Sequence, residues 1–283
     1  MAFFEYKDYL RILRFSAIES IKNTGKLCTS EQEIASSFLT RQVITGFSLK
    51  EILKGVSVDD VIRTFVGRQI FDFSSAHILC RTLFEGYINF FYLFFSTSDK
   101  DEKDFIHLYF RYHSIMERIK GLSALKSKNP RLSEFQNESK EYKEKILGNK
   151  YFDRLKQKEK NGILDAKSFT RLKIKELTIL AGFHESFYQT FYNVTSWHTH
   201  SNPASIEQVN AVRSPEDSKE LISLPLEWST LFLGLSINAV SKIIGDIGRN
   251  IQKEDEVIRI IEDCHLLQSQ DWGSDEFNLS SHR

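Results

Sequence analysis

The sequence predicts an all-α protein: an irregular multi-helix bundle with long apolar helices in its core. Apolar residues recur at spacings of three and four over long windows, which is the period of an amphipathic helix. The 283 residues contain only four prolines, and no segment shows the apolar–polar alternation of a half-buried strand. A hydrophobic content of 41% is ample for a sizeable core.

The N-terminal segment is expected to form two amphipathic helices. The first runs from Phe3 to Ile21, and Gly25 lies just beyond it, where glycine commonly terminates a helix. The run Thr29–Glu33 has the residue pattern of a capping box. It therefore predicts the start of a second helix, which reaches about Val43.

Two further helix starts precede a strongly apolar stretch. Ser48 and Ser57 each carry a hydroxyl of the kind favoured at the start of a helix. We expect a short helix after the first, and a helix after the second that leads into an apolar helix over residues 70–97. Another long apolar helix is expected from Asp217 to about Gly245.

These two apolar stretches resemble membrane spans in length. Ile70–Phe95 is interrupted by charged residues and a histidine, and Leu221–Val240 contains Pro225 and Glu227. Charged groups inside a bilayer are costly and rare. We therefore expect two buried core helices and no membrane partner. Charged residues from Glu5 onwards also interrupt any apolar region of a signal peptide.

The same periodicity places the remaining helices. They are expected at Phe105–Leu122, Phe183–Trp197 and Glu254–Leu267. Residues 123–170 are rich in lysine and poor in apolar side chains, which predicts a solvated helical hairpin with loops.

Composition bounds the compartment, the partners and the domains. Lys and Arg together number 38, as do Asp and Glu, so the formal net charge of +0 does not indicate a nucleic-acid partner. The three cysteines are scattered without a CxxC pair, which predicts a reducing cytoplasm. We expect an N-terminal helical module over residues 1–55, a helical core domain over 56–268 and a disordered tail over 269–283.

Two polar stripes lie on otherwise apolar helices and mark the candidate site. Residues four apart share one face of a helix, so each stripe forms a ridge. The first stripe is His77, Arg81, Glu85 and Asn89, and the second is Tyr192, Ser196 and His200. An unpaired buried charge is very costly. Arg81 and Glu85 are therefore expected to contact the Tyr192–His200 segment in a buried polar site.

The stripes have a structural and a functional interpretation. Tyr192, Ser196 and His200 would satisfy Arg81 and Glu85 across a helix interface in the structural interpretation, which we favour. Arg81 could hold Glu85 and still present its guanidinium group to an anion. The spacing of Ser196 and His200 also permits a hydroxyl–imidazole contact oriented by Glu85, as nucleophilic catalysis requires.

His198 and His200 are the candidates for metal binding. Pro203 should end the helix near His200, and a continuing helix would turn the two imidazoles about 200° apart. The spacing marks no third ligand, whereas a zinc site needs at least three protein ligands. We expect no metal and no cofactor.

Arg259 and His265 form a further candidate motif. Helical metal-independent ribonucleases carry an arginine followed several residues later by a histidine. Roughly one such match is expected by chance at average residue usage. Ile260 stands where that motif usually has a polar residue.

A family resemblance rests on the two polar stripes. Arg81 to Glu85 on an apolar helix, then Leu180 to His184, then the Tyr-x3-Ser-x3-His element resemble an uncharacterised family of all-helical bacterial proteins, the domain of unknown function numbered 5677. The resemblance covers roughly residues 60–245. It implies a helical fold, a bacterial cytoplasmic setting and a shared polar site, and it supplies no activity.

The sequence thus predicts a cytoplasmic helical protein that binds an unknown small ligand or protein partner. The polar-site candidates are His77, Arg81, Glu85, Asn89, Tyr192, Ser196, His198 and His200. The alternative is a metal-independent ribonuclease of a toxin or defence type. A nuclease should show an open basic groove with a histidine exposed beside an arginine, whereas a binding site would be enclosed.

Overall fold

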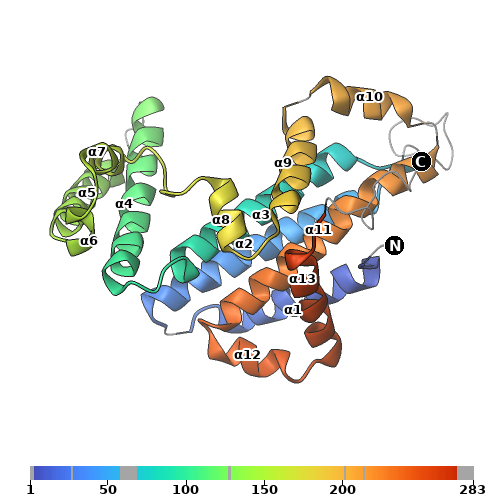
Figure 1. Ribbon diagram of the computed structural model, residues 1–283, viewed down its shortest axis with the longest axis horizontal. Coiled ribbons are helices and arrows are strands. Elements are labelled where there is room, and N and C mark those ends of the chain that lie inside the picture. Colours follow the sequence, from blue (N-terminus) through green and yellow to red (C-terminus); the bar gives the residue numbers. More distant parts are fainter. Residues whose placement is uncertain are drawn as a thin grey trace. The chain divides into compact units, whose positions relative to one another are not determined.

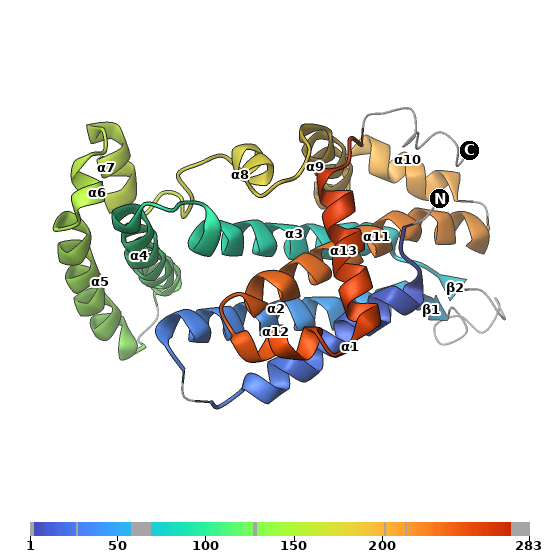
Figure 2. The same cartoon turned by 60° about the horizontal axis from the view of Figure 1, so that its bottom comes forward.

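The computed structural model describes residues 3–26, 28–57, 69–126, 129–200, 202–212 and 214–272. Within these residues the chain forms thirteen helices (Figure 1) and one pair of two-residue strands (Figure 2). Strands β1 (Val56–Ser57) and β2 (Gln69–Ile70) pair antiparallel, with Val56 opposite Ile70. The predicted all-α fold is confirmed.

The helices follow one another with short connections. They are α1 (Tyr6–Asn23), α2 (Ser30–Leu53), α3 (Phe73–Phe95), α4 (Lys100–Ala124), α5 (Arg131–Leu147), α6 (Lys150–Asp153), α7 (Gln157–Leu164), α8 (Ile174–Leu180), α9 (Glu185–Thr199), α10 (Pro203–Ala211), α11 (Pro215–Ser241), α12 (Gly245–Ile251) and α13 (Asp255–Ser269).

Helix α2 is longer than the sequence predicted. It continues through Ser48, whose hydroxyl donates to the carbonyl of Ile44 inside the helix instead of capping a new one. The start of α2 agrees with the prediction, because Thr29 and Gln32 form the expected capping box. The helix expected to begin at Ser57 falls mostly on residues 58–68, which lie outside the described residues.

The chain divides into two compact units. One contains the residues up to Phe90 together with those from Thr178 onwards, and the other contains Phe91–Leu177. Helix α3 therefore contributes its first eighteen residues to one unit and its end to the other. The predicted N-terminal module over residues 1–55 stays a prediction; in this structure its helices belong to the same compact unit as α11 and α13.

Helix α11 is the central element of the first unit. It packs against α1, α2, α12 and α13, and Figure 2 shows α1 and α2 running side by side. Gly234 permits the close approach of α13, because a Cβ atom there would lie 2.5 Å from Sγ of Cys264. The sequence placed Trp272 in a disordered tail; it is buried and packs edge-on against Phe187 at 5.2 Å between ring centroids. The tail beyond residue 272 lies outside the described residues.

Among the described residues, two helices are long and apolar enough to cross a membrane. They are α3 and the Glu220–Ser241 part of α11. In this structure half of the most apolar window of α3, and two thirds of that of α11, is buried inside the protein. Length and composition are shared by membrane spans and by core helices.

The second unit is built on a helical hairpin of α4 and α5. Tyr109 and Tyr112 on α4 donate from their hydroxyls to the backbone carbonyls of Ser168 and Leu164, respectively, which ties the segment after α7 to α4. Phe135 and Ile146 are the buried residues of α5, whose other side chains are half-buried or exposed. The lysine-rich part of the chain is thus the solvated helical segment that its composition predicts.

Candidate polar site between α3 and α9

A row of aromatic side chains sets the register between α3 and α9. Phe84 on α3 packs against Phe191 on α9 at 4.7 Å between ring centroids, and against Phe232 on α11 at 5.4 Å. Phe183 and Phe187 extend the row, with centroids 4.7 Å apart. Because these rings fix the helices in one register, the polar residues beside them also meet in one arrangement.

Arg81 is the centre of the polar contact. Its Nε donates to Glu85 at 2.8 Å, one terminal nitrogen donates to the Ser196 hydroxyl at 3.2 Å, and the other donates to the Tyr192 hydroxyl at 2.9 Å. The guanidinium carbon also lies 4.4 Å from the centroid of the Tyr192 ring. The predicted contact of Arg81 with the Tyr192–His200 segment is confirmed, whereas the one contact that the described residues give Glu85 is with Arg81.

The site is more open than the sequence suggested. The side chain of Arg81 is 15% exposed, but that of Glu85 is 42% exposed. The expectation of a buried Arg–Glu pair is therefore wrong for Glu85, which faces solvent from the outer side of α3. Burial disfavours the charge of Arg81, but hydrogen bonds and attraction to Glu85 and Tyr192 outweigh this and raise its pKa.

One helical turn earlier, His77 stacks on His198. The two rings are parallel within 2° at 4.3 Å between centroids, and their residues are only 3% and 4% exposed. Burial, and then the proximity of His198, lower the pKa of His77 to about 3. Burial also lowers the pKa of His198, while Asp72 opposes this shift. Both imidazoles are therefore neutral at neutral pH.

The histidine pair adjoins a third buried polar group. The ring of Trp228 on α11 lies 5.8 Å from that of His77. Nδ1 of His77, Nε2 of His198 and Nε1 of Trp228 are buried without a hydrogen-bond partner among the described residues. The other ring nitrogen of His198, Nδ1, lies 3.2 Å from the Ser74 hydroxyl. This cluster is the deep end of the polar contact between α3 and α9.

The sequence did not predict that His77 and His198 form one cluster. It named His77 and His198 as candidates but assigned His200, rather than His198, to the stripe on α9. The two are two positions apart in the sequence and so lie on opposite sides of the helix, as their spacing predicts. His198 is buried and His200 is exposed at the C-terminal cap of α9. The contact with Ser74 had no signal in the local spacing.

Several predicted residues lie outside the contact. Asn89 is exposed on α3, one turn beyond Glu85. Arg259 pairs with Asp8 and, at 2.8 Å, with Asp263. His265 instead contacts Asn238 at 2.8 Å and Gln268 at 3.1 Å. The arginine and histidine of the ribonuclease-like motif therefore have separate partners.

The histidine pair does not have the geometry of a shared metal site. Lone pairs of imidazole nitrogens lie in the ring plane, so two parallel stacked rings confine them to two parallel planes, which do not meet at one ion. Across the described ranges of the chain, no group of three or more His, Cys, Asp and Glu side chains is placed to hold a metal ion.

Comparison with known proteins identifies a family. The model of a family of unknown function, DUF5677, matches residues 68–219, just over half of the chain. The chain belongs to this family. The match is narrower than the range 60–245 over which the sequence resembles it. No curated protein and no solved structure matches the chain.

The region that matches DUF5677 contains both sides of the polar contact. Arg81 and Glu85 on α3 fall inside it, as do Tyr192, Ser196 and His198 on α9. Trp228 on α11 lies beyond it. The Arg81 contact is thus formed entirely by the part of the chain that defines the DUF5677 match.

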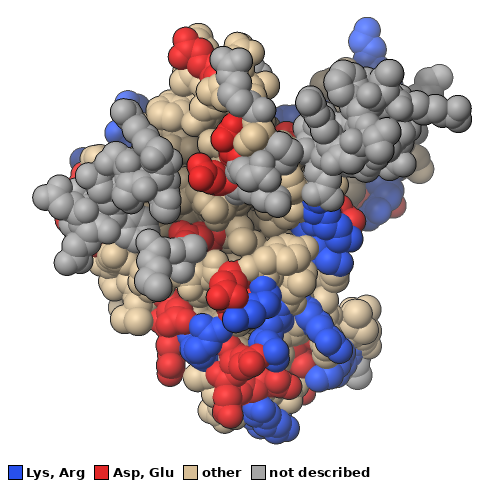
Figure 3. Space-filling view, turned by 90° about the vertical axis from the view of Figure 1, so that its right-hand side faces the viewer, with Lys and Arg blue, Asp and Glu red and all other residues tan. Residues whose placement is uncertain are grey.

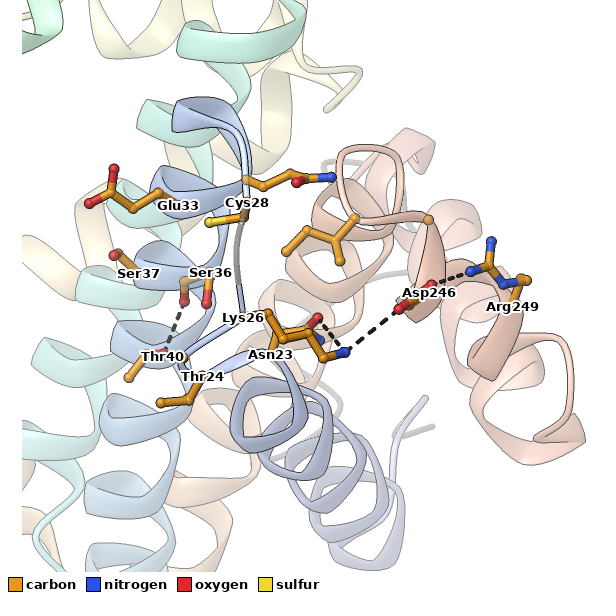
Figure 4. A pocket seen from close by; sticks show the side chains of 14 residues that line it. Asn23, Thr24, Lys26, Cys28, Glu33, Ser36, Ser37, Thr40, Asp246 and Arg249 are labelled. Carbon is orange, nitrogen blue, oxygen red and sulfur yellow. Dashed lines mark hydrogen bonds and ion pairs between the residues drawn. The ribbon is translucent and has the colours of Figure 1, made fainter.

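A separate cavity lies outside the DUF5677 region. It has a volume of about 740 Å³ and is lined by the end of α1, the start of α2 and the start of α12. In Figure 4, Lys26 points toward Asp246, at 3.6 Å, and Asp246 also binds Arg249. Lys26 and Arg249 at this cavity therefore share the carboxylate of Asp246.

The surface charge has a mixed pattern. On the face shown in Figure 3, Lys and Arg side chains stand beside Asp and Glu side chains. The described residues of this face therefore present no continuous basic surface of the kind that nucleic-acid binding requires.

Proposed function

We propose that this DUF5677 protein is a small-ligand-binding protein of the cytoplasm, with its site at the Arg81 contact. The observation that carries the proposal is that Arg81 donates to two hydroxyl groups at once, those of Tyr192 and Ser196. All three side chains are half-buried, and Glu85 at the edge is exposed. The free thiols of Cys28, Cys80 and Cys264 support the reducing compartment.

The hydroxyl groups supply the binding chemistry. A hydroxyl that accepts a hydrogen bond from an arginine still has its own O–H to donate. The structure gives neither Tyr192 nor Ser196 an acceptor for this proton among the residues it describes. Two hydroxyl protons beside one guanidinium group therefore form a pre-arranged donor site, which is typical of the few polar groups that orient a small ligand.

The ribonuclease alternative receives less support. It requires an exposed histidine beside an arginine and a basic groove for the phosphate backbone. Arg259 and His265 have separate partners, and the histidine nearest Arg81 along α3 is the buried His77. The binding interpretation needs none of these features, but the site is less enclosed than the sequence predicted for a binding site.

A thermal-shift screen of the purified protein against a set of small polar metabolites tests the proposal. Ligands of this site should raise the melting temperature of the wild-type protein and have no effect on Arg81→Met. Arg14→Met is the matched control, because Arg14 is an exposed arginine of the same compact unit. The proposal is overturned when no compound stabilises the protein, or when all stabilising compounds act equally on Arg81→Met.

A further inference from the structure

We infer that the ligand is a neutral planar heterocycle that carries a hydrogen-bond acceptor next to an N–H donor on one edge, as nucleobases do. This inference rests on the proposed function and specifies the ligand class of the same site.

The two hydroxyl groups indicate that the ligand carries a hydrogen-bond acceptor. Tyr192 and Ser196 accept hydrogen bonds from Arg81, so each can offer its own proton to a ligand. Their oxygen atoms are also polarised by the guanidinium group, which strengthens them as donors. A carbonyl oxygen or a ring nitrogen of the ligand is the group that matches them.

The carboxylate of Glu85 indicates that the ligand also carries a hydrogen-bond donor. Its Oε1 accepts from Nε of Arg81, and the structure gives its Oε2 no partner within the described part of the chain. An ionised carboxylate only accepts hydrogen bonds. Since Glu85 is 42% exposed, this oxygen is available to an N–H group. Glu85 and Tyr192 lie around the same planar guanidinium group, so the acceptor and the donor of the ligand should be neighbours.

The neutrality of the ligand follows from the charges. Arg81 and Glu85 form an ion pair and cancel each other. Among the residues that contact Arg81 there is no second cation to compensate a phosphate or carboxylate group. An anion would also approach the exposed carboxylate of Glu85, and like charges at close range repel. The site therefore favours a nucleoside or free base over a nucleotide.

The planar shape follows from the tyrosines of α9. Tyr188 and Tyr192 stack with their centroids 5.1 Å apart and 23° between the ring planes. Tyr188 is half-buried, and its ring adjoins Tyr192, which binds Arg81. Exposed aromatic rings are the usual stacking surface for nucleobases, because every base has a π-face.

Isothermal titration of the full chain with nucleosides tests the inference. Uridine, guanosine and adenosine are compared with 3-methyluridine and N6,N6-dimethyladenosine, which keep the ring but lose the N–H donor. At least one unmodified nucleoside should bind, and its methylated form should bind at least about tenfold more weakly, as the loss of one hydrogen bond to a charged group predicts. A 5′-phosphate should not strengthen binding.

Variants assign the binding to the site. Glu85→Gln and Tyr192→Phe should each weaken nucleoside binding by about tenfold or more. The half-buried tyrosine of α5, which lies in the other compact unit, provides the matched control Tyr142→Phe, which should bind as the wild type does. Circular dichroism of each variant excludes loss of the fold as the cause.

The outcomes separate the two proposals. If benzoate or inorganic phosphate binds in an Arg81-dependent way and no nucleoside does, the site binds ligands but the inferred class is wrong. Equal binding of methylated and unmodified nucleosides also overturns the class. If neither these probes nor the thermal-shift screen yields a ligand that depends on Arg81, the proposed function itself fails.

Discussion

The side chain of Arg81 shows how the exposure of a partner limits the strength of a polar contact. Removal of a fully buried partner would cost about 3–5 kcal/mol, but Glu85 is 42% exposed and keeps its hydration when Arg81 is lost. The two hydroxyl bonds and the contact with the Tyr192 ring are also lost. We predict that Arg81→Ala lowers the free energy of unfolding by about 1–2 kcal/mol, measured by urea denaturation.

A double-mutant cycle isolates the ion pair. Arg81→Ala, Glu85→Ala and the double variant should give a coupling energy of about 0.3–1 kcal/mol, the value for a partly exposed pair one turn apart on a helix. A coupling energy of several kcal/mol would contradict the exposure of Glu85 and restore the buried network that the sequence suggested.

The lowered pKa of His77 predicts that the free energy of unfolding decreases in acid. Its pKa is about 3 in the folded protein, below the usual value of 6.5, because burial and His198 disfavour its charge. The unfolded chain therefore binds a proton below about pH 6.5 that the folded protein does not. The resulting loss of stability begins as the pH falls below about 6.5, grows by about 1.4 kcal/mol per pH unit, and levels off near pH 3.

Urea denaturation at several pH values measures this slope. His77→Gln should reduce the slope between about pH 6 and pH 3, because the variant has no group with this pKa difference. The matched control is His200→Gln, whose side chain is exposed, and it should keep the wild-type slope. Identical slopes for His77→Gln and the wild type would show that His77 does not titrate abnormally.

At the scale of the elements, the crossing of α11 and α13 depends on Gly234. A Cβ atom at this position would meet Sγ of Cys264 at 2.5 Å, and Cys264 is fully buried. Gly234→Ala therefore overpacks the crossing, and we predict a loss of about 1–3 kcal/mol in the free energy of unfolding. Thermal and urea denaturation both measure it.

Gly121 provides the comparison for this substitution. It lies in α4, and a Cβ atom there has no neighbour within 4 Å. Gly121→Ala should stabilise the protein by about 0.5–1 kcal/mol, since alanine is the better helix former. If both substitutions change stability in the same direction, helix propensity rather than the helix crossing decides the effect at Gly234.

The elements also show what the sequence predicts and what it does not. Periodicity and capping residues predicted most helices, and Thr29 caps α2 as expected. The spacing of four residues predicted which side chains share one face of α3 and of α9. The structure shows Arg81 on one face bound to Tyr192 and Ser196 on the other. The stacking of His77 on His198, and the contact of His198 with Ser74, depend on how α9 is rotated against α3. That rotation is set by the packing of Phe84 and its neighbours, which no local pattern contains.

At the scale of the whole molecule, the two compact units are stabilised by different interactions. The first unit contains the aromatic cluster of Phe84, Phe187 and Trp228, which are all fully buried. In the second unit, Arg171 binds Tyr151, Glu102 at 3.3 Å and Glu159 at 3.1 Å. Apolar burial is insensitive to screening, whereas partly exposed ion pairs are weakened by salt.

A second set of ion pairs joins α4 to the segment after α6. Arg154 binds Asp99 at 3.1 Å and Asp101 at 2.6 Å, and its side chain is about half exposed. Both sets of pairs therefore lie where dissolved ions reach them. Each pair contributes about 0.2–1 kcal/mol at low salt. Together with the Arg171 pairs, they make the stability of the second unit dependent on salt.

Amide hydrogen exchange tests this difference between the units. Raising NaCl from about 0.05 M to about 1 M shortens the screening length from roughly 14 Å to about 3 Å. Amides of α4 and α7 should then exchange about three- to tenfold faster, while those of α9 and α11 should change little, because their protection rests on aromatic packing. Arg171→Leu should accelerate exchange in α4 and α7 already at low salt and reduce the further effect of NaCl. A uniform change across both units would mean that they open together and that the ion pairs around Arg171 do not set the stability of the second unit.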